Sequence, residues 1–229
     1  MPLTVRFMRR PDISQVTEID HDAFPTEWPP TNFPRELDNK LAYYIVACET
    51  DAATPQTDSK SSNREIQPGI LSRVRRIFVR GPVPNEDPVA ASRILGFAGM
   101  WLLADEAHIT SIASHKDHRH QGIGEALLIS LIEMAIAKKA RIVTLEARVS
   151  NQIAQNLYYK FNFDKLGVRK AYYLDNKEDA VIMSTEYIGS PSFHEKFTRV
   201  KIAFFQKRGT FNNETVSYTH LTLPTILLV

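Results

Sequence analysis

The most constraining feature of the chain is a run with two glycines, Arg119-His120-Gln121-Gly122-Ile123-Gly124, which separates a predicted strand from a predicted helix. The residues before it, Ala107 to Ser114, alternate in the manner of a strand. The residues after it, Glu125 to Lys139, carry apolar side chains at helical spacing. Glycine lets a backbone approach a ligand closely, and the first N–H groups of a helix have no partner within it. The run therefore predicts an anion site suited to phosphate.

A purely geometric explanation of the same glycines stays open, because tight turns need glycine for their backbone conformation alone. The run is not a P-loop, since no Gly-Lys-Ser/Thr sequence follows it. It is not the dinucleotide fingerprint either, because Leu127 stands where the third glycine would fall. Taken alone, the six residues favour phosphate binding and a structural turn equally.

Alternation and helical spacing also predict the elements around this turn. Asp12 is expected to cap a helix that reaches Phe24, and Thr31 a short helix that reaches Leu37. Ser192 and Glu195 form a capping box for a last helix ending at about Lys207. Strands are expected at Leu3 to Met8, Ala42 to Glu49, Ile94 to Leu103 and Arg141 to about Glu146, with a helix at Asn151 to Phe161.

With these elements in place, the chain resembles the GNAT superfamily of acetyl-CoA-dependent N-acetyltransferases. Arg119, Gly122 and Gly124 match its Gln/Arg-x-x-Gly-x-Gly/Ala pyrophosphate loop. The resemblance is greatest to the RimI group, which acetylates the N-terminal alanine of ribosomal protein S18, and it covers about residues 3 to 187 apart from one insertion. Four further stretches carry it, namely Ala23 to Trp28, Asp105 to Thr110, Leu145 to Asn151, and Tyr172-Tyr173 followed by Glu178 to Met183.

This resemblance implies an α/β fold in which helices flank a mixed central sheet with splayed central strands. It implies an acetyltransferase domain at 1–189, with a polar insertion at about 51–91, and a C-terminal helix at 190–210. The helix is expected to be a packing appendage whose apolar side chains face the domain, namely Phe193, Phe197, Val200, Ile202 and Phe204.

The resemblance also implies a site for acetyl-CoA. Backbone groups of Ile112 and Ser114, with Ala113 between them, are expected to pair with the pantetheine arm as an added strand would. Arg119 is expected to add positive charge, and Asn151 to contact the cofactor arm as well as cap its helix. The backbone amides that are expected to hold the pyrophosphate belong to His120, Gln121, Gly122, Ile123, Gly124 and Glu125.

Amine acetylation needs a neutral amine, although a free N-terminus has a pKa of about 8, and a proton for the departing thiolate. By resemblance, Glu146 is expected to be the base, directly or through a water, and Tyr158 the acid. From the residues alone, Glu146 could equally be a strand-end residue paired with Arg148, and Tyr158 a core aromatic.

The acceptor is expected to lie between two aromatic loops, which contain Phe24 and Trp28 on one side and Tyr172 on the other. These side chains could also be simple loop anchors. Two alternatives stay open. The acceptor could be a small-molecule amine in place of a protein N-terminus, or the chain could be a non-catalytic acyl-CoA-binding module. No metal is expected, because the histidines near the glycine run have no cysteine or supporting pattern around them, namely His115, His118 and His120.

Composition narrows the classes of protein to which the chain can belong. A chain of 229 residues with 43% hydrophobic residues is expected to form one domain, and a net charge of +2 gives no bias towards nucleic acid. Its single cysteine, Cys48, is expected to be a buried thiol. No signal-peptide core or membrane-length apolar run is present in the sequence. A cytoplasmic monomer is the simplest expectation.

Two segments depart from the pattern of the superfamily. The insertion, Asp51 to Ala91, is polar but contains a basic and apolar stretch, Ile70 to Arg80. That stretch is interpreted as a hairpin or helix on the domain edge in preference to a contact for an acidic partner or ribosomal RNA. Residues 211–229 are expected to be disordered, and Val216 to Val229 resembles the translation of a sequencing-library adaptor, so no part of the fold is expected there.

Overall fold

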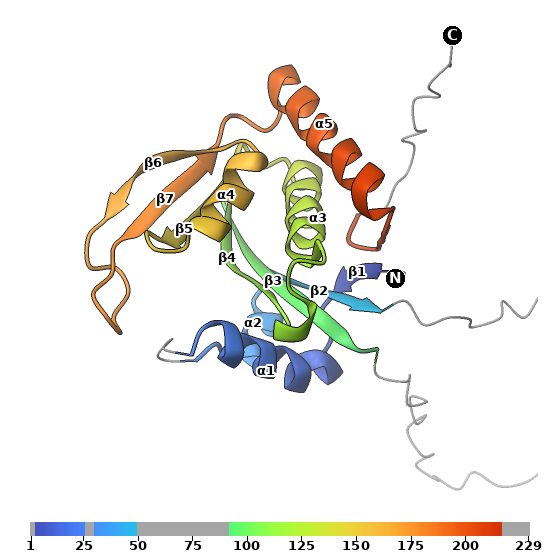
Figure 1. Ribbon diagram of the computed structural model, residues 1–229, viewed down its shortest axis with the longest axis vertical. Helices are drawn as coiled ribbons and strands as arrows, with labels where there is room; N and C mark the ends of the chain where they lie inside the picture. Colours follow the sequence, from blue (N-terminus) through green and yellow to red (C-terminus); the bar gives the residue numbers. More distant parts are fainter. Residues whose placement is uncertain (1–2, 26–29, 50–91, 217–229) are drawn as a thin grey trace, which may run out of the picture. The chain divides into compact units, whose positions relative to one another are not determined.

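One mixed sheet, ordered β6-β7-β5-β4-β3-β2-β1-β8, organises the computed structural model, which describes residues 3–25, 30–49 and 92–216 (Figure 1). Neighbouring strands pair antiparallel except for β4 with β5 and β1 with β8, which are parallel. This is the mixed α/β sheet that the sequence predicts. The strands are β1 (Leu3–Phe7), β2 (Ala42–Glu49), β3 (Ile94–Leu103), β4 (Glu106–Ser114), β5 (Ile142–Arg148), β6 (Phe163–Arg169), β7 (Ala180–Thr185) and β8 (Asn212–Asn213).

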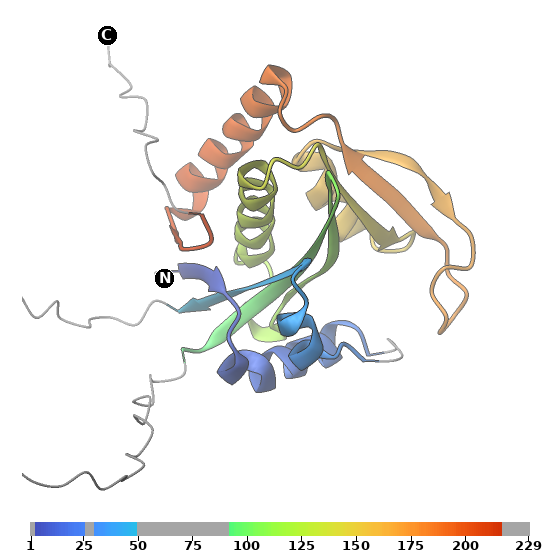
Figure 2. The same ribbon diagram turned by 180° about the vertical axis from the view of Figure 1, so that it is seen from behind.

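Helices cover both faces of this sheet (Figures 1 and 2). The helices α1 (Ile13–Ala23) and α2 (Phe33–Asp38) lie on one face, and α3 (Ile123–Ala137), α4 (Gln152–Lys160) and α5 (Pro191–Arg208) lie on the other. Two short 3₁₀ turns, η1 (Arg10–Asp12) and η2 (Lys116–His118), precede α1 and the glycine run. The buried apolar side chains accordingly form two clusters, one on each side of the sheet.

Helix α3 is apolar around most of its circumference because it is enclosed between the sheet and α5. Ten of its residues are buried, including Leu127, Leu128 and Leu131. Full burial of one such side chain stabilises the fold by about 1.5–3 kcal/mol. On the opposite face, the ring of Phe33 meets those of Tyr44 and Phe97 edge-on, at centroid distances of 5.7 and 5.6 Å. The two cores hold the central strands from both sides.

The two central strands part half-way along their length. Register joins β4 to β5 from Glu106–Ile142 to Ile109–Leu145 and ends there. Beyond this point β4 continues along β3, with an irregularity next to Thr110, while β5 continues along β7. The splayed central strands that the resemblance implies are therefore confirmed.

Two predicted helix caps, Thr31 and Ser192, are wrong, and the third, Asp12, is right in position only. Asp12 occupies the N-cap position of α1, but its carboxylate forms no cap there. It pairs instead with Arg6 at 2.7 Å and accepts a hydrogen bond from the Arg9 backbone amide at 2.7 Å. The Asp12 carboxylate therefore belongs to a buried ion pair. Helix α2 is capped by Asn32, which accepts from the Arg35 amide at 3.1 Å, rather than by Thr31.

Helix α5 begins earlier than the capping box predicted. Ser190 is its N-cap and accepts from the Phe193 amide at 3.0 Å, whereas the Ser192 hydroxyl donates to Glu186. Pro191 explains the shift, because proline fits the first position of a helix, where its missing N–H costs nothing. Phe193, Phe197 and Phe204 are buried as expected; Ile202, at 42% exposure, is not, because it falls off the stripe that these residues define.

The segment after α5 is ordered as far as the structure describes it. Asn212–Asn213 pairs in parallel with β1, and the side-chain Nδ2 of Asn213 donates a hydrogen bond to Glu133 of α3 at 2.8 Å. The expectation of disorder from residue 211 is therefore wrong for Phe211 to Thr215. The calls on the 51–91 insertion, on Ile70 to Arg80, on Trp28 and on 217–229 lie outside the described residues. Among the described helices, none has both the length and the apolar content that a membrane span requires.

The packing of α5 yields a first prediction. Replacing Phe193 by alanine should lower the free energy of unfolding by about 3–5 kcal/mol, because the ring is fully buried and stacks on Phe197. Ile202→Ala on the exposed side of the same helix should change it by less than about 0.5 kcal/mol. Urea unfolding followed by circular dichroism measures both. Equal effects of the two substitutions would contradict the placement of α5 on the core.

Candidate active site

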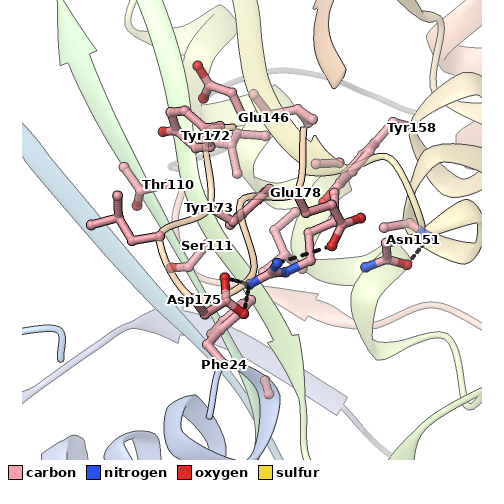
Figure 3. A pocket seen from close by; sticks show the side chains of 18 of the residues that line it. Phe24, Thr110, Ser111, Glu146, Asn151, Tyr158, Tyr172, Tyr173, Asp175 and Glu178 are labelled. Atoms are coloured by element: carbon pink, nitrogen blue, oxygen red, sulfur yellow. Dashed lines mark hydrogen bonds and ion pairs between the residues drawn. The ribbon is translucent and has the colours of Figure 1, made fainter. Parts of the chain in front are cut away.

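A cavity of about 760 Å³ opens where β4 and β5 part (Figure 3). Because the strands separate there, residues from both faces of the sheet reach the same space. Its wall combines the ends of β4 and β5 with the start of α4, the end of α1 and the β6–β7 loop. Six of the predicted site residues line it, namely Phe24, Ile112, Glu146, Asn151, Tyr158 and Tyr172.

Glu146 lies on β5 with its side chain only 10% exposed. Its carboxylate is held by a histidine and an arginine: Oε2 is 3.2 Å from His108 Nε2, and Oε1 is 3.2 Å from Arg169 Nη1. The hydrogen bond with His108 lowers the pKa of Glu146, burial opposes this shift, and the charges of His108 and Arg169 reinforce it. Glu146 is therefore a carboxylate at neutral pH.

Arg148, proposed as a partner of Glu146, has other partners. Its guanidinium binds Asp175 at 3.0 Å and Glu178 at 3.1 Å, and it lies over the Tyr173 ring at 3.9 Å from the centroid. Hydrogen bonds from Ser150 lower the pKa of Glu178 to about 2, with Arg148 and Asn176 adding to the effect. Burial raises the pKa of Tyr173 to about 12. These contacts fix the β6–β7 loop beside the cavity.

Tyr158 lies on α4 and combines the two roles that the sequence left open. Its ring belongs to the core cluster and lies 5.8 Å from that of Phe163, yet it also lines the cavity. Burial raises the pKa of its hydroxyl far above the usual value, so the group keeps its proton throughout the neutral range. Figure 3 shows both Tyr158 and Asn151 on the α4 side of the cavity.

Asn151 is the N-cap of α4, as predicted. Its Oδ1 accepts a hydrogen bond from the Ala154 amide at 3.0 Å. The same side chain lines the cavity, so capping and contact with a ligand are geometrically compatible.

The glycine run forms the turn that leads from η2 into α3. Gly122 is the N-cap of α3 with φ of 88°, and His120 also has a positive φ of 61°. A glycine N-cap has no side chain to satisfy the first helical N–H groups, so these groups remain available to an anion. The run lies outside the lining of the cavity and begins five residues beyond Ser114, where β4 ends.

The side chains of this run are engaged in different ways. Ile123 is buried in the core, so only its backbone can serve a ligand. The Gln121 side chain donates to the Asp117 carbonyl, and Glu125 forms an ion pair with Lys160 of α4. Arg119 is exposed at the end of η2. Of the strand residues before it, Ala113 is buried and Ser114 is half-buried.

Gly122 is required by α5 as well as by the turn. A Cβ at this position would lie 3.1 Å from Phe204 and 3.4 Å from Arg208, both on α5. The same Arg208 donates a hydrogen bond to the His120 carbonyl at 2.8 Å. A Cβ at Gly124 would make only ordinary contacts, at 3.7 Å from Leu157 and 3.9 Å from Ser114. Close approach to a ligand is therefore not the only reason for glycine in this run.

Of the residues predicted to hold the acceptor, the two that the structure describes lie on the cavity wall. Phe24 follows the end of α1, and Tyr172 belongs to the β6–β7 loop. The Tyr172 ring stands edge-on to Tyr173 at 5.2 Å, and the Arg169 guanidinium lies 5.3 Å from its centroid. An aromatic surface held in this way can contact an extended chain.

Sequence reasoning missed His108 and Arg169 as partners of Glu146. His108 lines the cavity, and its Nδ1 lies 2.9 Å from the Thr144 hydroxyl. The available signal was the polar face of two strands, since Glu106 and His108 alternate on β4 as Thr144 and Glu146 do on β5. Only the register between the strands shows that these faces meet.

The histidines near the glycine run do not form a ligand set with neighbouring groups. The rings of His115 and His118 lie 5.6 Å apart. In the part of the chain that is described, no group of three or more His, Cys, Asp or Glu side chains is placed to hold a metal ion.

Comparison with known protein sequences shows the family of this chain. The acetyltransferase (GNAT) family model matches residues 72–163. A Bacillus subtilis (strain 168) protein with the provisional name ribosomal protein bS18-alanine N-acetyltransferase is 35% identical over 180 residues, which is 78% of this chain and 92% of that protein. The chain belongs to the GNAT acetyltransferase family.

Two further comparisons agree with the family assignment. The ribosomal protein bS18-alanine N-acetyltransferase of Escherichia coli (strain K12) is 36% identical over 94 residues, which is 40% of this chain and 64% of that protein. The crystal structure of the Escherichia coli ribosomal-protein-S18-alanine N-acetyltransferase gives a TM-score of 0.53 at 21% identity and covers 80% of this chain and 92% of that one. This structural likeness supports the acetyltransferase fold.

The two glycines of the acetyltransferase loop should respond oppositely to alanine. Gly122→Ala should lower the free energy of unfolding by about 1–2 kcal/mol, because its positive φ disfavours a Cβ and Phe204 lies 3.1 Å away. Gly124→Ala should leave stability unchanged or raise it by up to about 1 kcal/mol, because alanine suits a helix better than glycine. Chemical unfolding compares the two. A larger loss for Gly124→Ala would contradict the assigned turn geometry.

Proposed function

We propose that this acetyltransferase moves the acetyl group of acetyl-CoA to the α-amine of the N-terminal alanine of ribosomal protein S18. The names of its Bacillus subtilis and Escherichia coli relatives support the substrate. The observation that carries the chemistry is that Glu146 and Tyr158, from opposite faces of the sheet, line one cavity. A ribosomal protein as substrate implies that the enzyme acts in the cytoplasm.

The residues present suit acetyl-CoA. Ile112 lines the cavity on the part of β4 that no longer pairs with β5, so this strand edge can bind an extended pantetheine arm through its backbone. The start of α3 offers N–H groups and a helix dipole to the pyrophosphate, and Arg119 adds charge beside it. Asn151 stands on the cavity wall between these parts and the reacting centre.

The acceptor amine must lose a proton before it attacks. Moving that proton from an amine with a pKa of about 8 to an ordinary Glu carboxyl, with a pKa of about 4.3, is uphill by about 5 kcal/mol. Glu146 is a still weaker base, because its pKa is lowered. Glu146 therefore attracts and orients the ammonium, and the proton passes to His108, whose Nε2 lies 3.2 Å from Glu146 Oε2.

The leaving thiolate needs a proton at the other side of the reacting centre. Tyr158 can supply it, because burial keeps its hydroxyl protonated at neutral pH. The hydroxyl also gains driving force in the transition state, when negative charge develops on the sulfur beside it. Glu146 and Tyr158 thus divide the work: one side of the cavity draws positive charge, and the other offers a proton.

The acceptor chain would enter past Phe24 and Tyr172. Both rings line the cavity, and Tyr172 is held by Tyr173 and Arg169. Asp175 and Glu178 share the Arg148 guanidinium at the neighbouring edge, and we assign the incoming ammonium to Glu146, the carboxylate on β5.

The function is tested by thiol release from acetyl-CoA in the presence of an S18-like peptide that begins with alanine. Mass spectrometry should locate one added acetyl group on the α-amine. The same peptide with its α-amine already acetylated is the matched control and should release no thiol. A panel of small amines runs alongside. Turnover with a small amine and none with the peptide would overturn the protein substrate.

Removing the proton donor, or the carboxylate that orients the ammonium, should slow the chemical step. Glu146→Gln and Tyr158→Phe should each lower the single-turnover rate by about 10²–10⁴-fold, with little change in acetyl-CoA affinity for Tyr158→Phe. Tyr159→Phe, an exposed neighbour on the same helix, is the matched control and should react at the wild-type rate. Wild-type rates in both site variants would refute these roles.

The aromatic wall should determine peptide affinity. Tyr172→Ala should raise KM for the peptide about tenfold, equivalent to ~1.4 kcal/mol of lost contact, while the limiting rate changes less. Tyr187→Ala removes an exposed ring that does not line the cavity and should leave KM unchanged. Steady-state kinetics with varied peptide measure both constants. An unchanged KM for Tyr172→Ala would show that the peptide binds elsewhere.

A further inference from the structure

Four polar side chains share one face of the short parallel ladder between β4 and β5. Glu106 and His108 alternate on β4, while Thr144 and Glu146 alternate on β5, and register places His108 opposite Thr144. The residues between them, such as Ala107 and Leu145, point into the core on the α3 side. The ladder therefore lays one polar stripe along the opposite face, beginning at the cavity.

The four groups are connected from end to end. Glu146 Oε2 lies 3.2 Å from His108 Nε2, and His108 Nδ1 lies 2.9 Å from Thr144 Oγ1. The Thr144 hydroxyl donates a hydrogen bond to Glu106 Oε1. Side-chain exposure rises along this path, from 10% at Glu146 through 25% at His108 to 42% at Glu106. The path thus joins the cavity wall to solvent.

We propose that Thr144 and Glu106 complete a proton exit path, which carries the proton of the acceptor ammonium from His108 to water. This inference rests on the proposed acetyl transfer and adds two positioning residues to it. With the acceptor bound, the ammonium replaces the His108 N–H as hydrogen-bond donor to Glu146, and His108 is neutral with its proton on Nδ1. The ammonium N–H bond breaks as the proton binds His108 Nε2. His108 Nδ1–H then gives its proton to the Thr144 oxygen while the Thr144 hydroxyl proton passes to Glu106. Glu106 releases one proton to water, and a flip of the neutral ring returns an N–H to Thr144 and an unprotonated nitrogen to the acceptor side, so one proton enters and one leaves in each turnover.

The charges around His108 fit this transfer. Carboxylates of Glu146 and Glu106 flank the ring at 3.2 and 3.9 Å, so they stabilise the imidazolium while it exists. Arg169 on β6 binds the other oxygen of Glu146 and keeps that carboxylate ionised. On the β3 side the register partner of His108 is Trp101, whose side chain carries no charge. Glu106 is the more exposed of the two carboxylates, so it is the one that can pass a proton to water.

A separate exit has a mechanistic advantage. The acceptor, the acetyl donor and then the products occupy the cavity throughout the reaction, so the cavity mouth is a poor route for the proton. The relay runs through side chains within the sheet and stays in place at every stage. Thr144 is buried, at 8% exposure, which protects its two hydrogen bonds from competing water.

The test removes the relay hydroxyl without changing the volume of the side chain. Thr144→Val should lower the single-turnover acetylation rate on the order of tenfold or more, and Glu106→Gln should lower it in the same direction. Thr144→Ser should restore most of the rate, because it restores the hydroxyl. Thr185→Val, which removes a buried hydroxyl from β7 outside the path, is the control and should react as the wild type does.

Chemical rescue separates a relay from a structural role. Adding imidazole buffer should restore the rates of Thr144→Val and Glu106→Gln, because a soluble base can accept the proton in place of the path. Melting temperatures and acetyl-CoA affinity should remain those of the control. Slow variants that imidazole does not rescue, or variants that react at the wild-type rate, would overturn the exit path.

The acceptor in this experiment is whichever amine the wild-type enzyme acetylates, so the two proposals fail separately. An active wild type with unaffected variants refutes the exit path alone. A wild type that acetylates only small amines refutes the S18 substrate and still permits the relay comparison. A wild type that is inactive with every amine refutes both proposals.

Discussion

The parting of β4 from β5 after Ile109 and Leu145 is the constraint on which the rest of the structure depends. Two neighbouring strands that separate give up backbone hydrogen bonds, and buried groups that lose such partners are costly. The chain offsets this cost by continuing each strand along an outer neighbour and by packing both faces of the sheet. The result is a place where polar backbone and side-chain groups from both faces meet one cavity, which an unbroken sheet could not provide.

Helix α3 connects this opening to the cofactor loop. Because it is enclosed by the sheet on one side and by α5 on the other, its apolar surface fixes the direction in which its N-terminus points. Helix α5 contributes to the loop directly, through the contact of Phe204 with Gly122 and the hydrogen bond from Arg208 to His120. The sequence predicts the C-terminal helix as a packing appendage, and the structure shows that it also supports the glycine turn.

Local signals in the sequence predicted β2 and β3 to the residue, since polar segments bound two long apolar runs. The turn at Gly122 and the N-cap at Asn151 were also found from sequence, because their chemistry is local. Where several Ser, Thr and Asn residues precede a helix, the sequence does not determine which of them is the N-cap. At α5 the position of Pro191 determines the start. The partners of Glu146 could not be found, because they depend on the register of β5 with β4 and on the reach of Arg169 from β6. β8 was missed for a similar reason, since two asparagines carry no strand pattern of their own.

The electrostatics of the site follow from placing a well-anchored carboxylate next to an imidazole. A carboxylate that accepts a hydrogen bond from His108 and pairs with Arg169 is a stable anion, so its lowered pKa makes it a poor proton acceptor. The hydrogen bond that lowers the pKa of Glu146 is the same contact that orients His108 towards it. The proposed reaction divides attraction of the ammonium and proton transfer between two side chains only 3.2 Å apart. Tyr158 differs on the other wall, because burial raises the pKa of its hydroxyl and keeps its proton in place at neutral pH. The two walls of one cavity differ in protonation because one belongs to a polar strand face and the other to the hydrophobic core.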